Sequence, residues 1–118
     1  MNSTKLKKAN LCGAFLQDAN LSNAKFQEAN LSGTNLCGAN LCSANLKNAN
    51  LSDANLENAN LEGANLEGAD LTRANLNGAN LSSVRINETT QLEKKWLLVW
   101  ETLNHASDKS VVMEDENF

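Results

Sequence analysis

The chain has 118 residues, 42% of them hydrophobic, and a formal net charge of −4 from 14 acidic and 10 basic side chains. This length is that of one domain. No segment approaches the run of about 18 apolar residues that a membrane span needs, and Met1–Lys5 lacks the apolar stretch of a signal peptide. We therefore expect a cytoplasmic protein that makes no contact with a membrane.

A five-residue repeat occupies residues 4–88. Seventeen apolar centres fall at every fifth position; fifteen are Leu, and the others are Phe26 and Ile86. A small residue, Ala in fourteen units, stands two places before each centre, and Asn directly precedes the centre in twelve units. A period of five fits neither a helix nor a flat strand. It predicts a solenoid, in which short units stack and share one core.

Turn chemistry supports the same interpretation. All six glycines lie two residues after a centre, and Asn23, Asn48 and Asn58 share that position. Gly and Asn tolerate the positive φ that the third residue of a type II turn requires. Each unit is therefore expected to be a short extended piece followed by a turn. Period and turn chemistry alone permit either a triangular or a four-sided coil.

The repeat Ala-Asn-Leu-x-x, as in residues 49–53 and 59–63, resembles that of the pentapeptide-repeat proteins. The resemblance covers about residues 4–88. It implies an all-β solenoid, a right-handed quadrilateral β-helix of about four coils in which residues twenty apart stack on one face. The Leu, Phe and Ala side chains would fill a narrow, dry interior that leaves no room for a cofactor.

The charged residues of the solenoid are mixed in sign. The twenty-residue register places opposite charges together in three pairs: Lys8 with Glu28, Lys47 with Glu67, and Asp53 with Arg73. Some family members protect topoisomerases by imitating DNA, so a DNA mimic acting on a topoisomerase is the alternative function. Duplex DNA carries one charge per roughly 1.7 Å of axis, whereas residues 1–88 hold seven basic and eight acidic side chains. We therefore interpret the charged residues as solvent-exposed surface groups that form ion pairs, which is a simpler interpretation than imitation of DNA.

Few side chains are candidates for catalysis or for metal binding. Cys12, Cys37 and Cys42 all lie just after a centre, and no two of them are twenty residues apart. They are therefore expected to be free thiols, which fits a reducing cytoplasm. Two further metal ligands do not stand out beside them, and no nucleophile–base pair or phosphate loop is visible. We expect no catalytic residue, no cofactor and no metal, and hence no enzyme.

The pattern changes after Ile86. Thr90 and Glu93 have the spacing of a capping box, and Leu92, Trp96, Val99, Trp100 and Leu103 fall on one helical face. The sequence predicts a helix from about residue 91 to 104 that covers the end of the solenoid. The segment 94–101 also resembles a helical segment of cyanobacterial family members. We divide the chain into a β-helix at 4–88, a capping helix at 89–105 and an acidic tail at 106–118.

These observations favour a non-catalytic protein-interaction or scaffold module with a protein partner and no nucleic-acid partner. Phe15 occupies an outward position where later coils carry Asn, close to the uncapped amino-terminal end. It is the first candidate interaction residue, and Trp96 and Trp100 are the others. We expect a monomer, or a weak homodimer formed through the amino-terminal coil.

Overall fold

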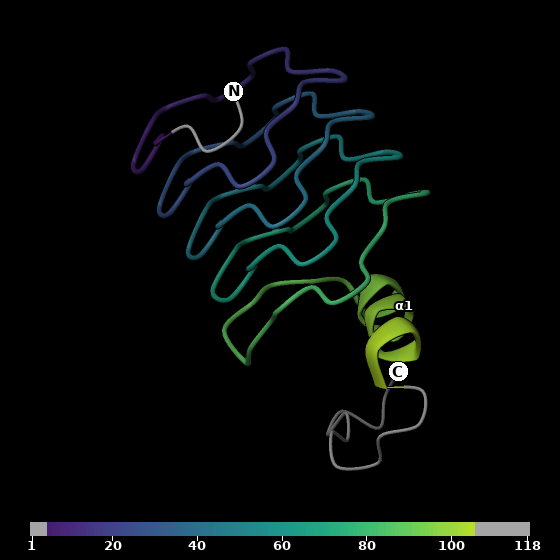
Figure 1. The fold of residues 1–118 in the computed structure, drawn as a ribbon. Coiled ribbons are helices and arrows are strands. Elements are labelled where there is room, and N and C mark those ends of the chain that lie inside the picture. Colours follow the sequence, from purple (N-terminus) through teal and green to yellow (C-terminus); the bar gives the residue numbers. More distant parts are fainter. Residues whose placement is uncertain (1–4, 106–118) are drawn as a thin grey trace.

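The computed structural model describes residues 5–105. These residues form a rod of stacked coils with one helix across its carboxyl-terminal end (Figure 1), and the molecule measures 37 × 22 × 21 Å. Each coil pairs with the next through single parallel backbone bridges between residues twenty apart, from Lys5 with Lys25 to Asn65 with Arg85. Four five-residue units therefore make one coil, which confirms the twenty-residue register.

Every unit ends in a tight turn. The residue three places after a centre donates its N–H to the carbonyl of that centre, as Ala39 does to Leu36 at 3.0 Å. The residue two places after the centre has a positive φ throughout, from Lys8 (62°) to Ser83 (59°). This is the pattern of a type II turn. Gly68 shows a further need for glycine, because a Cβ there would collide with the Asn48 side chain of the preceding coil.

The five main-chain N–H groups of the interior unit 30–34 are all bonded. Three of them donate to neighbouring coils, one closes the turn, and one is bonded by the side chain that precedes the centre. Unit 30–34 gives the distances: Asn30 N to Ala9 O 2.8 Å, Leu31 N to Asn50 O 2.7 Å, Ser32 N to Asn30 Oδ1 3.0 Å, Gly33 N to Ser52 O 2.9 Å, and Thr34 N to Leu31 O 3.2 Å. A solenoid without long strands thus leaves none of these donors unpaired.

The Asn that precedes most centres has a defined local task. In all twelve such units its Oδ1 accepts the N–H of the residue two places on, and Asp70 does the same for Thr72 at 2.9 Å. Side chains of Asn and Asp are suited to this local bond. The repeated Asn therefore satisfies the one donor that stacking of the coils leaves open.

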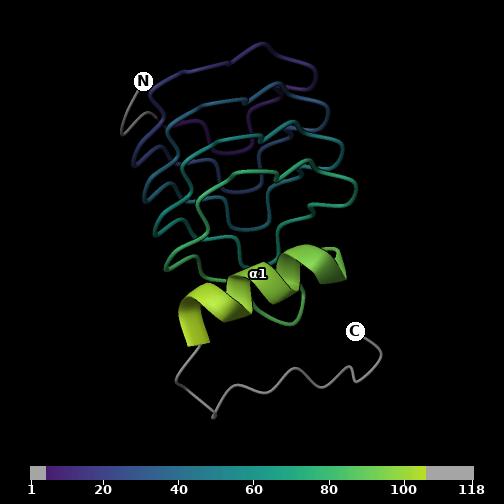
Figure 2. The same ribbon diagram turned by 90° about the vertical axis from the view of Figure 1, so that its right-hand side faces the viewer.

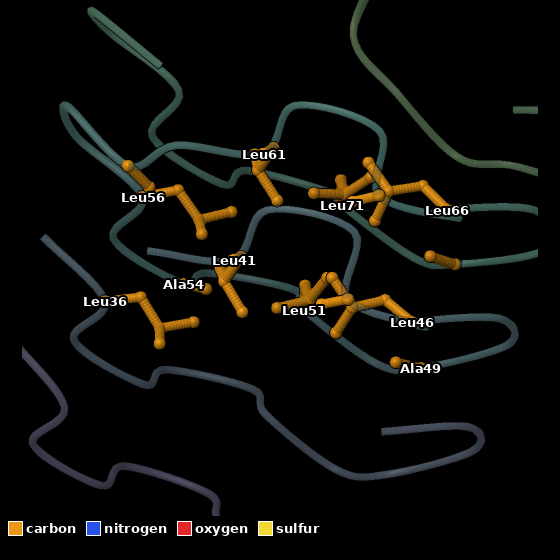
Figure 3. Close-up of a cluster of buried hydrophobic side chains, with 14 of the residues drawn as sticks. Leu36, Leu41, Leu46, Ala49, Leu51, Ala54, Leu56, Leu61, Leu66 and Leu71 are labelled. Carbon is orange, nitrogen blue, oxygen red and sulfur yellow. The ribbon is translucent and has the colours of Figure 1, made fainter. Parts of the chain in front are cut away.

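The core is a column of Leu and Ala side chains inside the coils. Figure 3 shows two of its layers, in which Leu56 and Leu61 lie over Leu36 and Leu41. Phe26 is completely buried, as is nearly every centre from Leu21 onward. The first coil is less covered: Leu6, Leu11 and Leu16 are only half-buried, because no coil precedes them within the described residues.

The last coil contains one extra residue. Asp70 pairs with Gln91, twenty-one positions later, because the turn after Ile86 lies one residue later than in the other units and is closed by Thr90 N and Asn87 O at 3.0 Å. The Thr90 hydroxyl donates to Leu66 O at 2.9 Å, as that of buried Thr34 donates to Leu11 O at 2.9 Å. The expected capping box is therefore wrong, since Thr90 is engaged in the coil and repeat-like pairing extends beyond residue 88.

Helix α1 (Lys94–His105) lies across the end of this coil (Figure 2). It begins three residues later than expected, and the Glu93 carbonyl accepts the first N–H groups, from Trp96 and Leu97, at 3.0 Å. Within the described residues no helix is both long and apolar enough to cross a membrane.

Candidate functional site

The long faces of the rod carry exposed polar and charged side chains. Arg73 donates to both carboxylate oxygens of Asp53 at 2.8 and 3.0 Å, and Lys8 Nζ lies 3.8 Å from Glu28 Oε1. Two of the three expected pairs are therefore present. Glu67 instead accepts from Arg85 of the next coil at 3.4 Å.

The contact between Asp53 and Arg73 shifts the pKa of both groups. Hydrogen bonds from the Arg73 guanidinium lower the pKa of the Asp53 carboxyl, although some desolvation opposes the shift. The same hydrogen bonds, followed by the charge of Asp53, raise the pKa of Arg73. Both groups face solvent, so the pair is an ordinary surface contact and not a reactive site.

The three cysteines do not form a metal site. Cys12, Cys37 and Cys42 are all free thiols. The Cys12 thiol accepts a hydrogen bond from Ser32 Oγ of the next coil at 3.3 Å. Across residues 5–105 there is no cluster of three or more Cys, His, Asp or Glu side chains suited to a metal ion.

The carboxyl-terminal end is closed by side chains of α1. The indole N–H of Trp100 donates to Val84 O at 2.7 Å. The Asn104 amide donates to Leu81 O at 3.1 Å and to Trp100 O at 2.8 Å, and its oxygen accepts from Ser83 N. In earlier coils, carbonyl and N–H groups like those of Val84 and Ser83 are bonded by the next coil. Trp100 and Asn104 thus replace the missing coil, and the sequence pattern had not identified Asn104.

The two tryptophans point into the molecule. Trp96 is 9% and Trp100 8% exposed, and Lys95 Nζ lies 4.8 Å from the centre of the Trp96 ring. Val99 and Leu103, which were expected on the buried face, are exposed instead. The reason is geometric: α1 contacts the coil along the narrow line of Trp96, Trp100 and Asn104, so side chains flanking that line stay outside.

The outward side of α1 is apolar. Leu98, Val99 and Leu103 are 42%, 39% and 50% exposed, and with Thr102 they line a shallow hollow of about 290 Å³. We call these four residues the α1 outer face. A second hollow of about 290 Å³ lies where α1 meets the displaced turn at residues 87–90, and it is lined by Ile86, Asn87, Glu88, Thr90, Leu92, Leu97 and Trp100.

Phe15 is the exposed apolar residue at the opposite end. It is 81% exposed, and it stands in the bridge position where Asn35 and Asn55 follow in the next coils. Phe15 and the α1 outer face are thus separated by the length of the rod, and the structure does not bring the three expected interaction residues together. The tail expected at 106–118 lies outside the described residues.

Comparison with known proteins places this geometry in a family. The family model for pentapeptide repeats matches residues 4–41, 19–58 and 49–87. Rfr23, a pentapeptide repeat protein of the cyanobacterium Cyanothece 51142, is 45% identical with a TM-score of 0.70. That match covers 71% of this chain and 57% of Rfr23, so this chain spans little more than half the length of Rfr23. A search of curated proteins found no match.

Two further structures support the same fold. A pentapeptide repeat protein of Nostoc PCC 7120 is 31% identical with a TM-score of 0.56, over 75% of this chain and 84% of that one. One from the Arabidopsis thaliana thylakoid lumen has a TM-score of 0.71 over 93% of this chain and 81% of that one; at 24% identity it speaks for the fold alone. These likenesses imply a right-handed quadrilateral β-helix. The chain belongs to the pentapeptide-repeat family.

Proposed function

We propose that this chain is a non-catalytic protein-interaction or scaffold module of the cytoplasm, and that it binds a protein partner through an end of the solenoid. One observation carries the proposal. Among the described residues, the large apolar side chains that remain exposed are Phe15 and three members of the α1 outer face. Exposed apolar groups that gather in one place are typical of protein contacts. Three free thiols support a reducing compartment.

The alternative, a DNA mimic, lacks a favouring observation. Three ion pairs of opposite charge lie along the described faces, whereas imitation of a duplex needs a dense array of one sign. Faces with both signs of charge leave the ends as the places where a partner would gain apolar contact.

Affinity capture from the native cell extract tests the proposal, with the full chain as bait. The double variant Leu98→Glu/Leu103→Glu changes the α1 outer face, and Phe15→Asn changes the other end. A protein other than the chain itself that is retained by the wild type and lost with one of these variants supports the proposal. Equal retention by all three baits, or capture of no other protein, contradicts it.

A further inference from the structure

The basic residues of the solenoid gather on one of its four long faces. Residues 5–8 stack on residues 25–28, as the bridge between Lys5 and Lys25 shows, and the twenty-residue register continues this face through three further coils. Six of the seven lysines and arginines between positions 5 and 88 lie on it. We call this surface the basic face; it consists of residues 5–8, 25–28, 45–48, 65–68 and 85–88.

Charge separates this face from the other three. The basic face carries six basic and three acidic side chains, a net charge of +3. The remaining residues between positions 5 and 88 carry one basic and five acidic side chains, a net charge of −4. The solenoid is close to neutral in total because one positive face and three negative faces offset each other.

Four lysines of the basic face have no acidic partner among the described residues. Glu28 is paired with Lys8 at 3.8 Å and Glu67 with Arg85 at 3.4 Å, so both carboxylates in the middle of the face are already engaged. Successive coils lie about 4.8 Å apart, which is less than the Debye length of about 8 Å at 0.15 M salt. An anion beside the face therefore interacts with more than one of the four exposed side chains, which are Lys5, Lys7, Lys25 and Lys47.

Lys25 stands where the repeat normally has Asn, and the change is unfavourable for the fold. It stacks directly on Lys5, and like charges in opposed positions destabilise a sheet. It also lacks the amide oxygen with which Asn45, in the next coil, accepts Lys47 N at 3.1 Å. A residue that breaks a local rule of the fold without a compensating contact is typical of a functional position.

The chemistry of the face suits carboxylates on a protein. Proteins that bind single-stranded nucleic acid combine basic residues with exposed aromatic side chains that stack on the bases, and the described residues of this face expose no aromatic ring. The chain as a whole has a net charge of −4. A long polyanion or an anionic membrane extends beyond the face and is repelled there, whereas a short acidic segment meets the four lysines alone.

We propose that the basic face is an electrostatic docking surface for an acidic segment of a protein partner, held by Lys5, Lys7, Lys25 and Lys47. The contact is weak, because exposed ion pairs each contribute little and salt screens them. This inference goes beyond the proposed function, since it concerns a long face of the rod and not an end. Either can fail without the other.

A hexaglutamate peptide added to the isotope-labelled full chain tests the proposal, with amide NMR spectra to show which residues it affects. The test variant is Lys25→Asn/Lys47→Gln. It removes two charges and places at each position the residue that a neighbouring coil carries there, which is Asn45 for the first and Gln27 for the second.

The matched control is Arg73→Gln/Lys95→Gln. It removes two positive charges that lie away from the basic face, so the control and the test variant have the same net charge. A difference between them therefore measures the position of the charges and not their number.

At low salt the peptide should shift the amide signals of residues 5–8, 25–28 and 45–48. It should leave residues 15–18 and 35–38, on the opposite face, unchanged. The test variant should bind at least about fivefold more weakly than the wild type, and the control within about twofold of it. An increase from about 20 to 300 mM salt should weaken wild-type binding about tenfold.

Other results overturn the proposal. Absence of shifts on this face up to about 5 mM peptide does so, and so does an equal loss of binding in the test variant and the control, which would mean that net charge alone governs binding. Tighter binding of an oligothymidylate of equal charge, or of phosphatidylserine vesicles, lost in the test variant, would assign the face to nucleic acid or to a membrane instead. The spectra without peptide establish that each variant is folded; if a double variant is not, Lys47→Gln and Arg73→Gln repeat the comparison as single changes.

Discussion

Phe26 shows how strictly a single side chain is placed in this fold. It is the one aromatic centre of the repeat and is completely buried. Replacing Phe26 with Ala should reduce the free energy of unfolding by about 3–5 kcal/mol, because the change removes apolar contacts and leaves a cavity.

Urea denaturation measures this loss, and Phe15→Ala is the matched control, since Phe15 is 81% exposed. The control should stay within about 0.5 kcal/mol of the wild type. Comparable losses at the two positions would contradict the assignment of inward and outward residues.

Asn50 tests the local role of the repeated asparagine. Its Oδ1 accepts from Ser52 N at 3.0 Å and from Ser52 Oγ at 2.8 Å. Asn50→Ala should reduce the free energy of unfolding by about 1–3 kcal/mol, because it leaves a partly buried N–H without an acceptor. Ser52→Ala removes only the hydroxyl and should cost less. A larger loss with Ser52→Ala would mean that the turn does not depend on the amide.

Asp53 gives the molecule a predictable response to acid. Arg73 lowers the pKa of Asp53 in the folded chain, while the unfolded value is about 3.9. The pair therefore adds to the free energy of unfolding at pH values above about 3.9. This contribution is lost as the pH falls through the lower pKa of the folded chain. In an NMR titration of the carboxyl carbon, Arg73→Gln should move the midpoint upward. An unchanged midpoint would mean that the pair does not form in solution.

At the scale of elements, α1 stabilises the rod through polar bonds as well as apolar contact. Trp100 donates to Val84 O, whereas the buried Trp96 Nε1 has no hydrogen-bond partner. Trp100→Phe should therefore lower the free energy of unfolding by about 1–3 kcal/mol more than Trp96→Phe, because only the first change strands a buried acceptor. Thermal and urea melts of the two variants measure the difference. Equal losses would show that the Trp100 hydrogen bond adds no stability.

The sequence predicted the elements unequally. The units of the solenoid and their inward residues follow from a period that every unit repeats, so local turn chemistry and burial agree at each position. Helix α1 was predicted from periodicity, which indicates an apolar stripe. Periodicity does not show which residues of that stripe contact the last coil. Val99 and Leu103 lie beside that line, and Asn104, a polar residue, lies on it. The extra residue between Ile86 and Thr90 was missed because Thr90 also fits a helix cap.

For the whole molecule, the twenty-residue register determines how the coils stack. It stacks Lys8 on Glu28 and Arg73 on Asp53, and it leaves exposed apolar residues at the two ends. The sequence predicted this register only through resemblance to a family, since the period also allowed a three-sided coil. The side-chain partner of Glu67 could not be predicted, because several long basic side chains share its face.

Disulfide formation between chosen cysteines tests the register most directly. Ser32 Oγ already lies 3.3 Å from Cys12 Sγ, and stacked strands about 4.8 Å apart suit a disulfide. In a background with Cys37→Ser and Cys42→Ser, Ser32→Cys should form an intramolecular bond with Cys12 under mild oxidation, as peptide mapping would detect. Gln27→Cys, fifteen residues from Cys12, should not. A bond from residue 27 and none from residue 32 would contradict the four-sided coil on which this account rests.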